Sequence, residues 1–88
     1  MAVSKISLIP LFKKRLSSGD NLNNLIGDSA TGFYYVGVGV ANAPQDWTWL
    51  IVIGGSGTMQ VGFSENKIFL RAYTGSPLSW TSWRQITF

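Results

Sequence analysis

The sequence predicts an all-β protein, a small antiparallel meander of four to five strands preceded by an extended N-terminal arm. Two observations lead to this prediction. Side chains alternate in type from Phe33 to Val40 with the two-residue period of a strand. Further runs rich in aromatic and β-branched residues begin at Trp47, Thr58 and Ile68, and short polar or glycine-rich stretches separate them, as expected for hairpins.

Residues 1–20 are expected to form an N-terminal arm or linker, and residues 21–88 a single β-domain. Pro10 discourages a long helix in the first segment, which is therefore interpreted as an extended arm that crosses something such as a neighbouring subunit. A basic run, Lys13–Arg15, lies outside the β pattern and is expected to be a solvated junction. After it, the helical spacing of Leu22, Leu25 and Ile26 predicts one helical turn, with Asp20 as its cap.

The remaining strands are expected at Phe33–Val40, Trp47–Ile53, Thr58–Phe63, Ile68–Tyr73 and Trp80–Phe88. Gly54–Gly57 is expected to form a hairpin loop, and two further turns are expected at Ser64–Lys67 and Thr74–Pro77. The run Trp47–Ile53 carries no charge, and apolar residues occupy both of its alternating positions. We therefore expect both faces of this strand to be covered.

Composition narrows the class of protein. The 88 residues suffice for one small domain, and the chain has 45% hydrophobic and only 12% charged residues, so it is expected to fold. It has no cysteine to form a disulfide, so further stability must come from packing or from partner subunits, and a homo-oligomer is expected. No apolar run approaches the about 20 residues of a membrane-spanning helix, and neither membrane insertion nor a signal peptide is predicted.

The sequence argues against an enzyme. The chain has no histidine, which removes the usual base at neutral pH and the commonest metal ligand, so neither a metal nor another cofactor is expected. Its serines therefore have no histidine that could act as the base to activate a nucleophile. The four carboxylates all lie in polar turn stretches, where they usually serve the local backbone: Asp20, Asp28, Asp46 and Glu65. The glycine-rich stretches do not open helices, so they do not predict a phosphate site.

The four tryptophans are the most informative residues. Trp80 and Trp83, near the last strand, are expected in the core. Trp47 follows a loop that contains Asn42 and Asp46, and an aromatic ring beside amide and carboxylate groups is what a sugar site requires. Burial of Trp47 in a subunit interface is an equal alternative. The candidate ligand-binding residues are Trp47, Asn42, Asp46 and Tyr73.

A series of short motifs resembles the pyocin-knob family, whose domains sit at or near the C-terminal ends of phage tail fibres, tailspikes and tail-like bacteriocins. The resemblance runs from about residue 21 to residue 86. It rests on Asn21-Leu22-Asn23-Asn24-Leu25, Gly32-Phe33-Tyr34, Asn42-Ala43-Pro44, Leu50-x-Val52, Gln60, Arg71 and Trp80-x-x-Trp83, in this order.

The resemblance implies a small β-domain on a homotrimeric tail fibre or tailspike, placed to touch bacterial surface polysaccharide. It implies synthesis in the host cytoplasm and a position on the virion tail, extracellular after phage release. Residues 1–20 lie outside the match. Two interpretations stay open: this segment replaces the fibre shaft, or the chain is a separately produced C-terminal piece of a longer protein. Two rival classes stay open beside glycan recognition. One is a structural cap that promotes fibre folding and trimerisation, and the other, less favoured, is a single-stranded nucleic-acid-binding β-domain.

Overall fold

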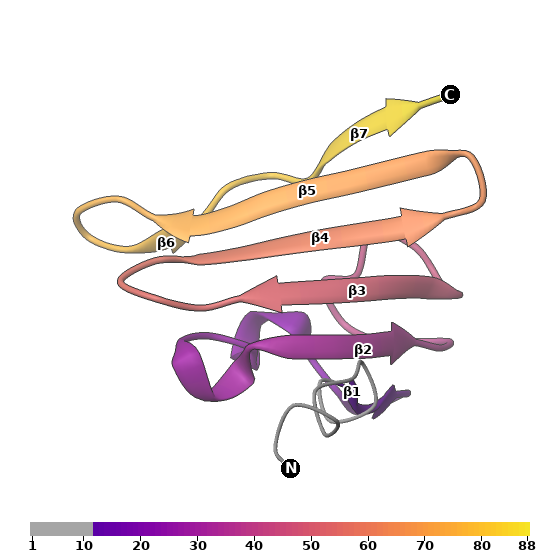
Figure 1. The fold of residues 1–88 in the computed structure, drawn as a ribbon, viewed down its shortest axis with the longest axis horizontal. Helices are drawn as coiled ribbons and strands as arrows, with labels where there is room; N and C mark the ends of the chain where they lie inside the picture. Colours follow the sequence, from indigo (N-terminus) through magenta and orange to yellow (C-terminus); the bar gives the residue numbers. More distant parts are fainter. Residues whose placement is uncertain (1–11) are drawn as a thin grey trace, which may run out of the picture.

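The computed structural model describes residues 12–88 and confirms an all-β fold (Figure 1). The predicted arm over residues 1–11 falls outside the described part. One seven-stranded sheet has the order β1-β2-β3-β4-β5-β6, and β7 also pairs with β5. The strands are β1 (Phe12–Leu16), β2 (Gly32–Val36), β3 (Thr48–Ile53), β4 (Thr58–Ser64), β5 (Lys67–Thr74), β6 (Ser79–Trp80) and β7 (Arg84–Thr87). The sheet thus has more strands than the four to five predicted.

Strands β2 to β6 form the predicted antiparallel meander. The hairpin loop between β3 and β4 falls at the predicted glycine-rich stretch. The turn between β4 and β5 is tighter than predicted, because Ser64 pairs with Lys67 and only Glu65 and Asn66 lie between them. The single last strand predicted from Trp80 is instead divided into β6 and β7, which pair with β5 one after the other.

In the described part of the chain the sheet begins at Phe12, within the segment 1–20 that the sequence predicts as an arm or linker. Strand β1 pairs in parallel with β2, with Arg15 opposite Tyr35 and Leu16 opposite Val36. The basic run is therefore part of an edge strand and not a junction outside the β pattern. Its charged side chains remain exposed, as is common for basic residues on sheet edges.

The strand predicted from Phe33 to Val40 ends four residues early, at Val36. The chain then turns at Gly39, whose φ of 77° suits glycine. Two short 3₁₀ helices precede β2, η3 (Leu22–Asn24) and η4 (Asp28–Ala30). The cap of η3 is Asn21, whose side chain accepts from the Asn23 amide, and not Asp20 as predicted.

The core lies on one face of the sheet. Alternate residues of the central strands point to this face, and Leu22 of η3 and Ala30 of η4 are buried in the same cluster. The buried cluster comprises Leu16, Leu22, Ala30, Tyr34, Val36, Val40, Leu50 and Val52. The hydroxyl of Tyr34 donates to the Ala30 carbonyl at 2.6 Å, and burial raises the pKa of this phenol.

A polar pair on β4 and β5 is buried on the same face. Gln60 donates to the carbonyls of Leu22 and Leu25 and accepts from Nε of Arg71 at 2.9 Å. The Arg71 guanidinium stacks over Trp80 at 3.8 Å from the ring centroid, and desolvation lowers its pKa to about 10. Nη2 of Arg71 is buried without a hydrogen-bond partner among the described residues.

Trp83 completes this arrangement from the segment before β7. Its ring lies 4.8 Å from the Arg71 guanidinium, and its indole N–H donates to the Asn42 carbonyl. It is half-buried and packs against the core, in agreement with its predicted core role. Trp80 also is only half-buried. The two tryptophans thus close the edge of the core rather than fill its centre.

The other face of the sheet is not covered by the described residues. On β3, Thr48, Leu50 and Val52 are buried, whereas Trp49 and Ile53 are about half exposed, at 54% and 50%. Within residues 12–88, the prediction that both faces of this strand are covered is therefore not met. In this part of the chain the sheet is one layer, with the loops on one side only.

Candidate carbohydrate-binding groove

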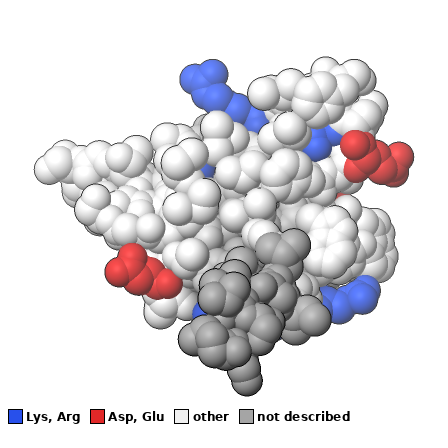
Figure 2. Space-filling model, in the orientation of Figure 1, with Lys and Arg blue, Asp and Glu red and all other residues white. Residues whose placement is uncertain are grey.

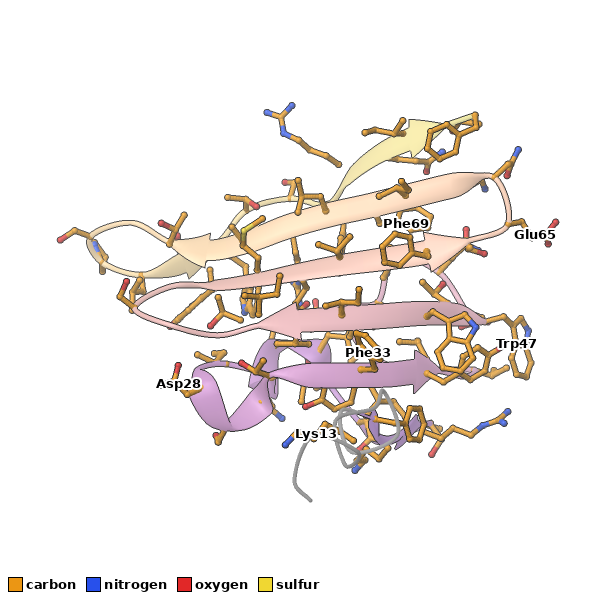
Figure 3. The ribbon with its side chains drawn as sticks, viewed as in Figure 1. Lys13, Asp28, Phe33, Trp47, Glu65 and Phe69 are labelled. Carbon is orange, nitrogen blue, oxygen red and sulfur yellow. The ribbon has the colours of Figure 1, made fainter. Side chains whose placement is uncertain are left out.

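A groove lies at one end of the sheet, where β3 begins and β4 turns into β5. Figure 3 shows Trp47 and Glu65 at this end and Asp28 at the opposite end. The groove has a volume of about 370 Å³, within the roughly 300–1,000 Å³ of small-molecule sites. Its lining is Tyr35, Gln45, Asp46, Trp47, Trp49, Phe63, Ser64 and Glu65. We call it the aromatic groove.

Four aromatic rings line the groove, and three of them, Tyr35, Trp47 and Trp49, lie next to one another. Tyr35 and Trp49 are opposite each other in the β2–β3 register, with ring centroids 4.7 Å apart in an edge arrangement. Trp47 lies beyond them, 6.5 Å from the Tyr35 ring and 53% exposed. Such exposed rings offer flat surfaces to the C–H face of a sugar, whereas buried rings could not.

The backbone holds Trp47 in an unusual conformation. Its φ is 55°, a region that bulky residues rarely adopt and that costs about 1–3 kcal/mol. Two side chains fix the neighbouring backbone. The hydroxyl of Thr48 donates to the carbonyls of Gln45 and Asp46, and the hydroxyl of Ser64 donates to the Trp47 carbonyl. The structure therefore maintains a strained residue at the position where its ring is presented outward.

Polar groups border the rings. Gln45 donates through Nε2 to the Ser64 hydroxyl at 2.7 Å, which orients its amide. Asp46 accepts from the Gly39 amide through Oδ1, and Glu65 is exposed on the β4–β5 turn. Amide and carboxylate oxygens of this kind are the acceptors that sugar hydroxyls require.

Arg15 adds a cation at the β1 side. Its guanidinium lies 5.3 Å from the Tyr35 ring centroid and 5.9 Å from that of Trp47. These distances are within the range of cation–π contacts. Arg15 also lines an adjoining hollow of about 410 Å³ with Phe12, Tyr35 and Trp49. The two hollows share Tyr35 and Trp49, so an extended ligand could follow both.

The structure brings together two of the four predicted site residues. Trp47 and Asp46 both line the aromatic groove. Asn42 does not, because its amide donates to Asn21 and its carbonyl accepts from Trp83. Tyr73 packs on Trp80, 5.1 Å between centroids, and lines a hollow with the β3–β4 loop at the other end of the sheet.

The sequence reasoning missed Tyr35, Trp49 and Arg15. Tyr35 and Trp49 fall on the same alternating face of their strands, and that alternation was the available signal. It did not show that the two rings are directly opposite, because this depends on the register. The sequence assigns Arg15 to the basic run outside the β pattern, because nothing local predicts that β1 pairs with β2 in parallel.

A second hollow, of about 490 Å³, lies beside the gap between β6 and β7. Its lining is Met59, Leu70, Arg71, Ala72, Thr81, Ser82 and Arg84. It offers hydroxyls and an exposed arginine but no aromatic ring, so it has fewer of the features that a sugar site needs.

The described residues present no group of histidine, cysteine or carboxylate side chains suited to hold a metal ion. Within residues 12–88, no helix has the length and apolar character to cross a membrane. Asp46 and Glu65 share the groove, and both are exposed.

Comparison of the chain with protein-family models, with curated proteins and with solved structures finds no match.

Proposed function

We propose that the protein is a non-catalytic recognition module for bacterial surface glycans, carried on a viral tail fibre or tailspike. The observation that supports this most directly is the aromatic groove. It combines two half-exposed tryptophans with amide and carboxylate acceptors at one end of a rigid sheet. Binding sites on such scaffolds hold their geometry without reorganisation.

The ligand class follows from the lining. Flat rings favour sugar rings, and the acceptors Asp46, Glu65 and Gln45 suit hydroxyl donors. Arg15, stacked beside Trp47, can pair with a carboxylate on an acidic sugar. A capsular or other surface polysaccharide presents all of these groups along one chain, and the two adjoining hollows suit more than one sugar unit.

The test is an array of bacterial surface polysaccharides probed with the purified protein. We expect saturable binding to at least one glycan. Trp47→Ala should weaken that binding by about tenfold, corresponding to 1.4 kcal/mol, while Trp47→Phe keeps a ring and most of the affinity. Phe88→Ala is the matched control, because Phe88 is the last residue of the chain and its side chain is 74% exposed.

Other outcomes would contradict the proposal. Equal binding by Trp47→Ala, Trp49→Ala and the parent protein would place any glycan site elsewhere. New reducing ends or unsaturated sugars during incubation would show catalysis. Affinity that collapses with added salt would favour a nucleic-acid ligand, because phosphate binding releases counterions.

A structural cap is the second candidate, and the uncovered face of the sheet is the observation that favours it. In that case the protein would assemble and stabilise its fibre without binding any glycan. The same polysaccharide array separates the two candidate functions if the oligomer mass of each variant is measured together with its glycan binding.

A further inference from the structure

The uncovered face of the sheet is the largest feature that the groove leaves unexplained. It carries seven large apolar side chains that are 36–57% exposed: Phe12, Trp49, Ile53, Met59, Phe63, Leu70 and Ile86. The register places them together, because Trp49 is opposite Phe63, Ile53 opposite Met59, and Ile68 opposite both Phe63 and Ile86. Half-buried Phe33, Ile51 and Val61 fill the spaces between them.

The size of this patch approaches that of a protein interface. If each large side chain carries about 150–250 Å², these exposed fractions give a patch of roughly 500–800 Å², and its upper end reaches the about 800 Å² that each partner contributes to a standard interface. Soluble monomers rarely expose more than about 300–600 Å² in one apolar patch. The patch on the described residues is thus at or above the upper end of what monomers expose.

The charges on this face restrict the partner. On the described strands its charged side chains are Arg15 on β1 and Arg84 on β7, the outer strands on either side. Figure 2, in the same orientation, shows most charged side chains of the described residues near the outline. These strands carry no carboxylate that would attract a basic partner. The two arginines are on opposite outer strands, so they do not form a continuous binding surface for an anionic ligand. The complement must be another flat, uncharged, apolar surface.

We propose that a second copy of this chain covers the open face, so that it is a homotypic interface. A copy of the sheet supplies a surface of the same kind and area, and two sheets pack face to face about 10 Å apart. Self-association also gives a small chain without disulfides a second layer on the face that residues 12–88 leave open. Two residues of the patch, Trp49 and Phe63, also line the aromatic groove, so the interface would adjoin the ligand site.

Ile53 and Met59 are suited to test the proposal, because they are exposed, lie opposite each other and are not groove residues. In the double variant Ile53→Lys/Met59→Glu the new charges pair across the strands, which the single sheet tolerates. The same charges would be buried in the interface. Light scattering should give at least twice the monomer mass of 9.6 kDa for the parent protein and for Ile53→Leu/Met59→Leu, but 9.6 kDa for the charged variant.

A second measurement does not depend on the charged variant folding. The chain has no cysteine, so one introduced thiol can be followed alone. The thiol of Ile53→Cys should react with a maleimide about tenfold more slowly than that of Ser56→Cys, an exposed residue of the β3–β4 loop, because thiol reaction requires access. A parent protein that stays monomeric at micromolar concentration, an oligomeric folded charged variant, or equal labelling of the two thiols would each overturn the proposal.

Discussion

Replacing Gln60 by leucine should destabilise the protein severely, although leucine is apolar and similar in volume. The Gln60 side chain is fully buried and joins β4 to two separate parts of the structure. Its Nε2 donates to the Leu22 carbonyl at 2.8 Å and to the Leu25 carbonyl at 3.3 Å. Its Oε1 accepts from the charged Arg71 guanidinium at 2.9 Å. The substitution removes all three hydrogen bonds and leaves their partners buried.

The size of the effect follows from the bonds lost. A hydrogen bond to a charged group contributes about 1.5–3 kcal/mol and a neutral one about 1 kcal/mol, so we expect a loss of about 3–5 kcal/mol. This is a large fraction of the 5–15 kcal/mol that stabilises a typical domain. The Arg71 guanidinium increases the cost, because its buried Nη2 already has no hydrogen-bond partner among residues 12–88 and the substitution removes the partner of Nε as well.

Urea unfolding, followed by tryptophan fluorescence at one fixed protein concentration, measures this loss. Gln85→Leu is the control, because Gln85 is exposed and donates only to the Thr87 hydroxyl, so its effect should stay within about 0.5 kcal/mol. Arg71→Met removes the buried charge, so the double variant with Gln60→Leu should lose at least about 1 kcal/mol less than the two single losses added. A loss below about 1 kcal/mol for Gln60→Leu, or strict additivity, would refute this reasoning.

Two further predictions concern the same core. Trp83→Ala should cost about 3–5 kcal/mol by removing a large ring from the core edge, and Trp83→Phe less; thermal or urea unfolding checks both, and a small loss for alanine would show that the ring is dispensable. Tyr34→Phe should cost about 1 kcal/mol at pH 7 through the lost bond to Ala30. Because folding raises the pKa of Tyr34, its contribution is complete below the unfolded value of 10.0 and is lost as pH rises through the folded value. The stability gap between the parent and Tyr34→Phe should therefore narrow above pH 10, and a gap that widens would contradict the assigned shift.

The parts of the fold that the sequence predicted are those that local patterns specify. The β3–β4 and β4–β5 hairpins follow from alternating apolar residues and short turns, and they appear where they were expected. Strand β1 could not be predicted in this way. Its residues Lys13–Arg15 have no strand pattern, and they become a strand only because β2, many residues later, offers a parallel partner.

The candidate site was predictable only in part, for a related reason. Trp47 and Asp46 are adjacent in the chain, so a local reading found them together. Asn42 is also near in sequence, but at its φ of 61° its side chain is directed to Asn21 instead. Tyr35 and Trp49 meet through the register of β2 and β3. A register shift of one residue would have placed the two rings on opposite faces of the sheet.

The groove and the open face have residues in common, so only a substitution outside this shared set can separate ligand binding from self-association. Trp49 lines the groove and also belongs to the apolar patch, so Trp49→Ala should weaken both ligand binding and self-association. Trp47 precedes β3 at the end of the sheet, whereas Ile53 ends β3 at the opposite end. We expect Trp47→Ala to lose ligand binding but keep the oligomer mass. We expect Ile53→Lys/Met59→Glu to lose the oligomer mass but keep ligand binding. Together these results would show that one small sheet uses its two ends differently. If both variants lose both properties, the groove exists only between copies, and the ligand must contact more than one chain.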